Sequence, residues 1–277
     1  LILWGIFFAD LPEDFIKENE ITVVPLYVNF PDKTYLDGVD IHPQEFYPLL
    51  EKAGNHLPKT STPSINDFLK TYQSLLQEGY EILSIHISSG LSSTASMAET
   101  AARMLKGNIR IFDSKSISLG IGLQVVSALE MIKKNLSLET VWEKLTKVRQ
   151  RTEVFFSLDT LEYLEKGGRI GKVSSLLGTI LKIKPVVKVE NGIYIPLGKV
   201  RNQKQAISKM VESMTKVLGQ KIPKHVAVAH GAAEEVACYF KKRIEENFDL
   251  KIDFFAETGP VIGVHTGPGT LGIAFTY

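Results

Sequence analysis

Short apolar runs and longer amphipathic stretches alternate along the first half of the chain. Apolar runs bounded by turn residues are typical of buried strands, and apolar residues spaced three and four apart are typical of helices. Strands are therefore predicted at residues 1–8, 21–30, 80–87 and 109–114. Helices are predicted at 43–53, 93–106 and 138–151. Three more are predicted: one that begins at residue 12, one that runs from 63 and ends at Gly79, and one that follows the strand at 109–114 and ends at about residue 135. This alternation predicts a parallel sheet with helices on its faces.

The second half of the chain has a different pattern. Alternating runs on both sides of Asn191-Gly192 predict an antiparallel hairpin, because this dipeptide favours the tight turn between paired strands. Other strands are predicted at 153–158, 225–231, 251–257 and after 261, and helices at 159–172 and through Glu235 and Arg243. We therefore expect two α/β domains. Residues 1–155 would carry a mostly parallel sheet, and residues 156–277 a mixed or antiparallel one.

Composition narrows the class of protein. The 277 residues are 44% hydrophobic and 23% charged, as in soluble globular proteins. A net charge of +1 offers no strong field for nucleic acid or an anionic membrane. No apolar run reaches the roughly 20 residues of a membrane span, and the apolar start lacks a basic flank and a cleavage site. The single Cys238 cannot form an internal disulfide, so a cytoplasmic location is expected.

A run of small hydroxyl side chains, SSGLSST at 88–94, follows a predicted strand and precedes a predicted helix. The sequence lacks the G-x-S-x-G of a nucleophile elbow and the glycine-lysine pattern of a Walker A loop. Unpaired N–H groups at a helix start favour an anion, and Ser88, Ser89 and Ser92 could add donors. Alternatively, these serines only cap the helix.

Two other segments allow the same two interpretations. In TSTPS at 60–64, one of Thr60, Ser61 and Thr62 is expected to cap the next helix, with Thr62 favoured, and the others are free to bind a ligand. His265 follows an apolar run that predicts a strand, just before glycines that permit close approach of another segment. A lone histidine of this kind is either structural or a ligand-binding group. No His/Cys cluster has metal-ligand spacing, so no metal site is predicted.

Basic residues mark two turns, KGGRIGK around Arg169 and GKVR ending at Arg201. A guanidinium can hold phosphate or an acidic surface through two parallel hydrogen bonds. Solvated surface charge after a glycine helix stop is the alternative.

Six segments in this order resemble the DegV family over nearly the whole chain. They are TSTPS, SIHISSGLSST, FDSKSISLG, LEKGGRI, LKIKPV and GVHTGPGTLG. The family includes the fatty-acid-binding subunits of bacterial fatty acid kinase. The resemblance implies a fatty acid between the two domains, with its carboxylate held by Thr60, Ser92 and His265. Ser61, Ser88 and Ser89 are possible further ligand-binding residues, and Arg169 and Arg201 possible contacts to a partner or a phosphate.

By this resemblance the protein is a non-catalytic subunit of bacterial phospholipid metabolism. It would present the carboxylate of a long-chain fatty acid to a separate ATP-dependent kinase, with no other cofactor. It would bind no nucleic acid and exchange lipid with membranes only transiently, without stable insertion. Two alternatives stay open: a serine-dependent acyl hydrolase or transferase that uses Ser92 with His265, and a lipid-filled regulatory interaction protein.

The chain departs from the family pattern at two places. Residues 5–8 read GIFF where members usually carry a polar T-D-S-T-like run, and Ser93 replaces a glycine. Polar groups expected at the first strand end are therefore missing.

Overall fold

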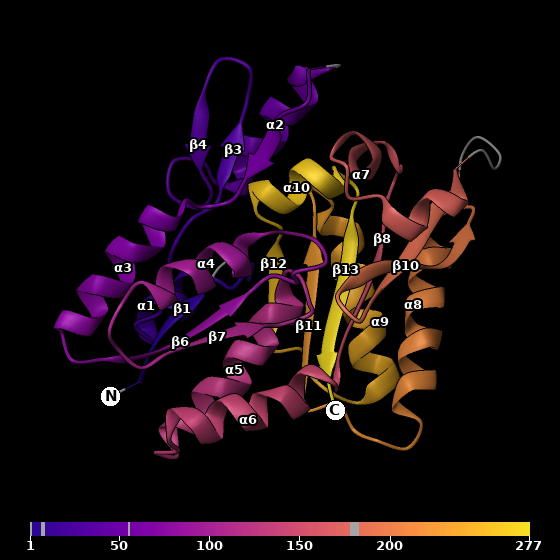
Figure 1. Cartoon of the computed structure of the whole chain (residues 1–277). Helices are drawn as coiled ribbons and strands as arrows, with labels where there is room; N and C mark the ends of the chain where they lie inside the picture. The colour runs from indigo at the N-terminus through magenta and orange to yellow at the C-terminus, as the bar shows by residue number, and fades with distance from the viewer. Residues whose placement is uncertain (1, 7–8, 55, 178–182) are drawn as a thin grey trace.

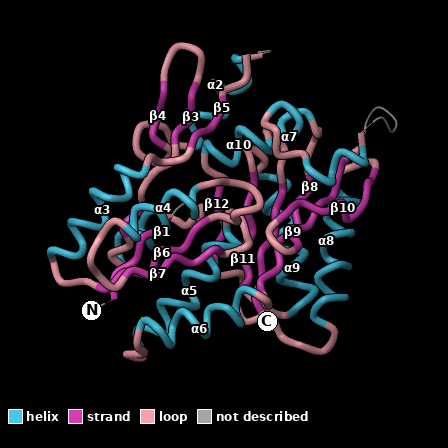
Figure 2. The backbone as a smooth tube through the Cα atoms, viewed as in Figure 1, coloured by secondary structure: helices cyan, strands magenta, loops and turns pink. Residues whose placement is uncertain are grey.

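The structure is a computed structural model that describes residues 2–6, 9–54, 56–177 and 183–277. Helices and strands alternate, and the first half of the chain packs beside the second (Figure 1). Figure 2 shows the strands grouped in separate sheets with helices around them. The prediction of an α/β fold with a parallel N-terminal sheet and a mixed C-terminal sheet is confirmed. No helix in the described part of the chain is long and apolar enough to cross a membrane.

The N-terminal sheet is parallel throughout, in the order β2-β1-β6-β7. Its strands are β1 (Ile2–Ile6), β2 (Thr22–Val23), β6 (Glu81–His86) and β7 (Ile109–Asp113). Its helices are α1 (Glu13–Glu18), α3 (Ile65–Gln77), α4 (Thr94–Arg103), α5 (Leu119–Lys133) and α6 (Leu138–Arg149). Side chains of α3 and α4, such as Phe68 and Ala98, pack with Ile82 of β6 in one apolar cluster. Parallel strands need such helical crossovers, which explains the alternation in the sequence.

A small antiparallel sheet, in the order β4-β3-β5, stands above the N-terminal sheet in Figure 1. It consists of β3 (Tyr27–Asn29), β4 (Thr34–Leu36) and β5 (Lys59–Ser61), and α2 (Pro43–Ala53) lies between β4 and β5 in the chain. The prediction of one strand over 21–30 was wrong. Pro25 falls between β2 and β3, which belong to different sheets, because proline lacks the N–H that would continue a ladder.

The C-terminal sheet has the order β10-β9-β8-β13-β11-β12 and is antiparallel except for the β11–β12 pair. Its strands are β8 (Thr152–Ser157), β9 (Lys184–Glu190), β10 (Ile193–Val200), β11 (His225–His230), β12 (Phe254–Glu257) and β13 (Leu271–Thr276). Alternate side chains point to opposite faces. Phe155 and Val228 pack with α8 (Gln203–Leu218) and α9 (Glu234–Phe248), and Phe156 and Ala229 belong to the core shared with the N-terminal half.

Two predicted elements differ from the structure. The predicted helix over 159–172 is α7 (Glu162–Lys166) followed by a 3-10 turn, η1 (Gly171–Leu176). Gly168, with φ of 69°, ends α7. The apolar run after 261, predicted as a strand, begins with α10 (Pro260–Thr266), because a short apolar run does not distinguish a strand from a buried helix.

Parts of two sequence features lie outside the described residues. The predicted first strand is confirmed over Ile2–Ile6, and positions 7 and 8 of the GIFF segment lie outside. Positions 181 and 182 of the LKIKPV segment also lie outside.

Candidate functional site

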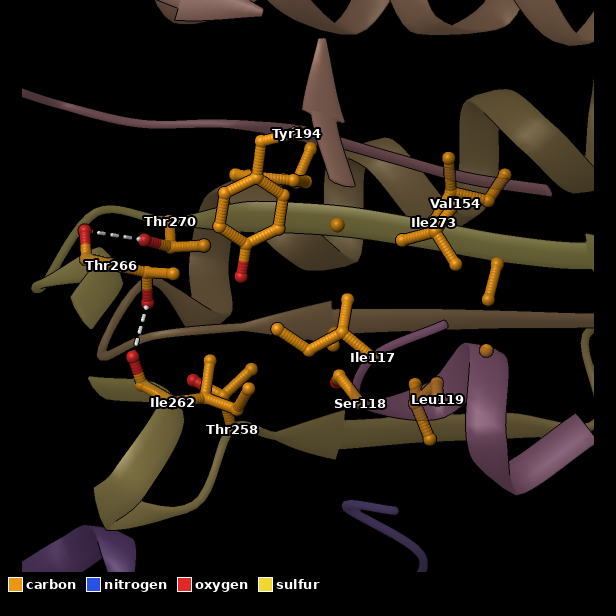
Figure 3. A pocket seen from close by; sticks show the side chains of 15 residues that line it. Ile117, Ser118, Leu119, Val154, Tyr194, Thr258, Ile262, Thr266, Thr270 and Ile273 are labelled. Atoms are coloured by element: carbon orange, nitrogen blue, oxygen red, sulfur yellow. Dashed lines mark hydrogen bonds between the residues drawn. The ribbon is translucent and has the colours of Figure 1, made fainter. Parts of the chain in front are cut away.

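An apolar cavity lies between the two halves of the molecule. Its accessible lining is almost wholly apolar. The residues before and at the start of α5 form one wall, and the sheet face opposite α8 and α9 forms the other. Figure 3 shows Tyr194 of the sheet on one side of this space and Ile117 and Leu119 on the other. A lining of this kind suits an apolar group.

Polar groups gather where α10 meets this cavity. Thr266 lines the cavity, and His265 precedes it in the last turn of α10. Nε2 of His265 lies 2.8 Å from Oγ1 of Thr60, so these two predicted ligands are in direct contact. Thr60 is fixed by the sheet register, since it pairs with Val28 in the middle of the β3–β5 ladder. Two segments 205 residues apart thus form one polar site.

The imidazole of His265 is held in its neutral form. Burial, and to a smaller extent the nearby positive charge of Arg169, lower the pKa of His265 to about 4. Nδ1 is buried and, within the described part of the chain, has no hydrogen-bond partner. A Cβ at Gly167 would lie 2.3 Å from Nδ1, so only glycine allows the turn after α7 to pack on the ring. At neutral pH the ring can therefore offer a neutral N–H donor or an acceptor.

Ser92 lies beside the start of α4, half-buried, with its Oγ 2.7 Å from Oγ1 of Thr94. Arg169 connects its segment to the histidine. Nε of Arg169 donates to the carbonyl of Leu91 at 3.4 Å, and Nη1 donates to the carbonyl of Gly167 at 2.8 Å. The sequence placed Arg169 in an exposed turn, but it is half-buried between the SSGLSST segment and the turn at His265.

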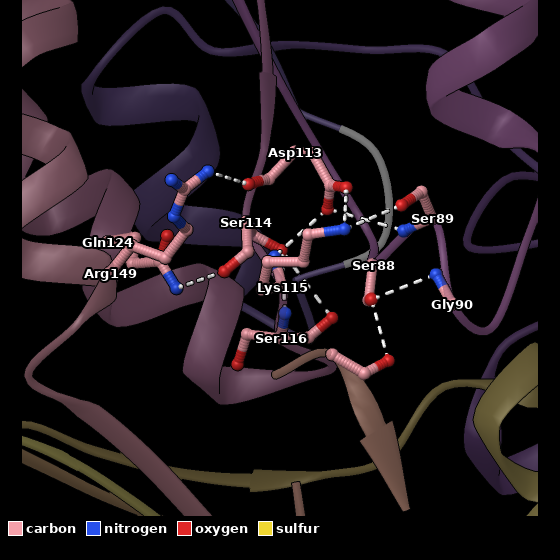
Figure 4. Close-up of polar contacts among 10 residues, drawn as sticks. Ser88, Ser89, Gly90, Asp113, Ser114, Lys115, Ser116, Gln124 and Arg149 are labelled. Atoms are coloured by element: carbon pink, nitrogen blue, oxygen red, sulfur yellow. Dashed lines mark hydrogen bonds and ion pairs between the residues drawn. The ribbon is translucent and has the colours of Figure 1, made fainter. Parts of the chain in front are cut away.

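Ser88 and Ser89 fix the shape of the loop before Ser92 (Figure 4). Oγ of Ser88 is buried and donates to the carbonyl of Gly192 in the β9–β10 turn at 2.7 Å. Oγ of Ser89 accepts a hydrogen bond from Nζ of Lys115 at 2.8 Å. Lys115 also forms an ion pair with Asp113, at 2.8 Å. Both hydroxyls thus have partners within the protein.

Two other predicted residues lie apart from this site. Ser61 is exposed and accepts a hydrogen bond from Nδ2 of Asn29 at 3.1 Å, and its neighbour Thr60 points to the opposite face of the strand. Arg201 is exposed before α8, where its backbone N–H donates to Oε1 of Gln205. Among the described residues, Arg201 has no hydrogen bond or ion pair with another predicted site residue.

The chemistry of the site is that of neutral hydrogen-bond donors. The hydroxyls of Thr60 and Ser92 and the neutral imidazole can bind a carboxylate without carrying a charge themselves. Within the described part of the chain, no hydrogen bond joins Ser92 to a histidine, and no group of three or more His, Cys, Asp or Glu is placed to hold a metal ion.

Several residues that shape the site were not among the predicted site residues. Gly167 and Lys115 lie in the LEKGGRI and FDSKSISLG segments, so those motifs were a signal that could have found them. Several residues that line the cavity also lie in motif segments, namely residues 117–120 in FDSKSISLG and Thr266 and Thr270 in GVHTGPGTLG. Others, such as Val154 and Tyr194, had no such signal and meet them only in the folded chain.

Relatives of the chain match it along nearly its whole length. Residues 8–277 match the family model described as "Uncharacterised protein, DegV family". A DegV domain-containing protein of Staphylococcus aureus (strain COL) is 35% identical over 265 residues, 96% of this chain and 94% of the relative. A DegV domain-containing protein of Clostridium acetobutylicum is 38% identical over 269 residues, again 96% and 94% of the two chains.

Solved structures share the fold over the whole chain. A DegV family protein from Thermus thermophilus, described as fatty acid binding, is 33% identical with a TM-score of 0.92, covering 100% of this chain and 99% of that one. DegV from Bacillus subtilis, described as a fatty acid binding protein, is 31% identical with a TM-score of 0.89 and the same coverage, 100% and 99%. A stearic acid-binding protein from Eubacterium ventriosum is 28% identical with a TM-score of 0.94, covering 100% and 98%.

Proposed function

Because the chain belongs to the DegV family, we propose that it binds a long-chain fatty acid between its two halves. The tail occupies the apolar cavity, and the carboxylate takes hydrogen bonds from Thr60, Ser92 and His265. The observation that carries this proposal is the 2.8 Å contact between Thr60 and His265 beside Thr266, which lines the cavity. The fatty acids named for the solved relatives support the same ligand class.

Burial of the tail supplies most of the binding energy. About 14 methylenes at roughly 0.8 kcal/mol each give on the order of 11 kcal/mol before the costs of ordering and association. The polar site then fixes the head group. With the pKa of His265 lowered to about 4 by burial, the imidazole stays neutral near pH 7, so hydrogen bonds bind the carboxylate without a buried cation.

The test is a titration of lipid-free protein with a fluorescent long-chain fatty acid, together with native mass spectrometry of protein purified from cells. The double variant Ser92→Ala/His265→Ala should raise Kd at least about 100-fold, since each charge-assisted hydrogen bond contributes roughly 1.5–3 kcal/mol. Ser93→Ala is the matched control, because Ser93 is exposed and makes no capping hydrogen bond. Unchanged affinity in the double variant would rule out this carboxylate site.

We further propose that the protein presents the carboxylate to a separate ATP-dependent kinase in the bacterial cytoplasm. The sequence has no nucleotide-binding motif of its own, and exposed Arg201 offers a planar group suited to phosphate or an acidic partner. Arg201→Ala should leave fatty-acid affinity intact and lower the yield of acyl phosphate with the cognate kinase. Equal yields from both proteins would make Arg201 an ordinary surface charge.

The hydrolase alternative has less support. Its Ser–His pair would require His265 to accept a proton from Ser92, whereas Nε2 of His265 faces Thr60 and Oγ of Ser92 faces Thr94. Hydrolysis of a p-nitrophenyl ester that is abolished by Ser92→Ala would restore this alternative.

A further inference from the structure

The helix that carries His265 begins against two half-buried carboxyl groups from the other half of the molecule. Oδ1 of Asp10, in the loop after β1, accepts a hydrogen bond from the backbone N–H of Gly259 at 2.8 Å. The carboxyl group of Asp37, just after β4, accepts one from the backbone of Val261. Pro260, between them, has no N–H to offer. The two acids therefore cap the start of α10 together.

These carboxyl groups face the same point of the backbone. A Cβ on Gly259 would lie 3.0 Å from Oδ1 of Asp10 and 3.4 Å from Oδ1 of Asp37. The other oxygen of Asp10 accepts a hydrogen bond from Oγ of Ser118. Oδ1 of Asp37 is buried and has no hydrogen-bond partner among the residues that the structure describes. A proton on this oxygen would turn an unsatisfied acceptor into a donor beside Asp10.

Other ionisable groups lie near the pair. Tyr47 of α2 interacts with Asp10, Asp37 and Glu257 of β12, and its hydroxyl oxygen lies 2.6 Å from that of Thr258. Glu13, Lys17 and His42 line the same pocket as the two acids. Nζ of Lys17 and Nδ1 of His42 each lie 3.2 Å from the carboxylate of Glu13, and within the described part of the chain no basic side chain forms an ion pair with Asp10 or Asp37. Two neighbouring carboxylates without an ion-pair partner repel each other, so one of them is expected to hold a proton.

We propose that Asp10 and Asp37 share one proton and that this proton holds α10, and with it His265, in the position that binds the fatty acid. The inference rests on the proposed function and adds two positioning residues and a dependence on pH to it. When the proton is lost, two carboxylates face each other at the start of α10. The helix is then held less firmly, and His265 at its far end is less well placed against Thr60.

The direction of the pH effect follows from the pKa values. Burial, and then the charge of Asp10, raise the pKa of Asp37 to about 8, and burial also raises the pKa of Asp10. A raised folded-state pKa of an acid means that the folded state binds the proton more tightly than the unfolded state. The free energy of unfolding therefore falls as pH rises from about 4 to about 8, and levels off above that. His265, with its pKa lowered to about 4, stays neutral over this upper range.

The experiment compares wild type, Asp37→Asn and Asp32→Asn between about pH 6.5 and pH 9.5. Asparagine keeps the acceptor for Val261 and supplies a permanent donor toward Asp10. Asp32, an exposed acid in the β3–β4 turn, controls for the change in net charge. In wild type and in Asp32→Asn, Kd for a fluorescent fatty acid should rise at least about fivefold across this range. In Asp37→Asn the profile should be flat.

Thermal unfolding of the lipid-free proteins tests the pair without a ligand. Asp37→Asn should be more stable than wild type at pH 8, and Asp32→Asn should not be. Identical unfolding profiles for wild type and Asp37→Asn would overturn the shared proton. If the unfolding of wild type and Asp37→Asn differs but the Kd of wild type does not change with pH, the proton does not affect the position of His265, and that part of the proposal is overturned. If none of the proteins binds fatty acid at any pH, the proposed function fails. The unfolding measurements still show whether Asp10 and Asp37 hold a proton.

A direct measurement covers the case in which Asp37→Asn does not fold. In wild-type protein with ¹³C-labelled aspartate, one carboxyl carbon should titrate near pH 8. Titration of all aspartates near their ordinary pKa of about 4 would contradict the proposal.

Discussion

The two hydroxyl-rich segments, TSTPS and SSGLSST, have nearly the same composition and both precede a helix, yet the fold uses them differently. In TSTPS, Ser64 caps α3, with its Oγ accepting from the backbone N–H of Asp67 and the Asp67 carboxylate accepting from the backbone N–H of Ser64. The cap of α3 is thus formed by Ser64, four residues after Thr60, and does not involve Thr60. Thr60 lies in a strand and is free to meet His265.

In SSGLSST the residue at the N-cap position, Ser93, makes no capping hydrogen bond. The loop is instead fixed by contacts from remote parts of the chain, namely the β9–β10 turn at Ser88 and Lys115 at Ser89. The difference shows that the two hydroxyl groups proposed to bind the ligand are positioned in different ways, one by local strand register and the other by distant packing. The first site should tolerate changes around its helix cap, and the second should be sensitive to changes in its loop.

The largest expected effect comes from Gly90→Ala in the second segment. A Cβ there would lie 2.6 Å from the carbonyl oxygen of Gly192 and 2.8 Å from Cγ2 of Ile193, and a backbone oxygen cannot move aside cheaply. We expect the free energy of unfolding to fall by about 1–3 kcal/mol and fatty-acid affinity to fall with it, because the loop carries Ser92. Urea unfolding and fatty-acid titration measure the two effects.

Ser93→Ala is the control for Gly90→Ala, as a change in the same loop that removes no hydrogen bond of the cap. Wild-type affinity in a folded Gly90→Ala protein would show that the β9–β10 turn does not position Ser92.

An intermediate effect is expected from Ser64→Ala in the first segment. Loss of the capping hydrogen bond should lower the free energy of unfolding by about 1 kcal/mol. Affinity should stay within about twofold of wild type, because Thr60 is held by the β3–β5 ladder. A marked loss of affinity, seen in the same titration, would mean that cap and ligand site are coupled in the first segment as well.

The smallest effect is expected from Lys115→Gln. The ion pair with Asp113 is partly exposed, with 41% and 23% of the two side chains accessible. Such pairs contribute about 0–1 kcal/mol, and salt screens them. We expect a small loss of stability that disappears at high ionic strength. A large, salt-independent loss would show that Lys115 is an essential part of the loop.

Local patterns in the sequence were enough to predict much of this fold. The parallel sheet and the Asn191-Gly192 hairpin follow from short-range signals, and the family resemblance pointed to Thr60 and His265, which the structure brings into contact. The N-cap was predicted at Thr62, but Ser64 caps α3, because the reciprocal bond with Asp67 favours the later start.

Long-range contacts could not be predicted from the sequence. Asp37 reads as a turn residue and Asp10 as the start of a polar loop, and only the fold places both against Gly259. The same holds for Arg169, whose two carbonyl partners belong to different halves of the molecule.

The position of β13 in the C-terminal sheet has a consequence for synthesis of the chain. This strand, at residues 271–276, lies between β8 and β11, and each of them pairs with it over six residues. Because β13 is synthesised after both of its neighbours, β8 and β11 each keep one side unpaired until it has emerged from the ribosome. The centre of this sheet is therefore expected to close last, and until then the exposed edges of β8 and β11 are open to pairing with other strands.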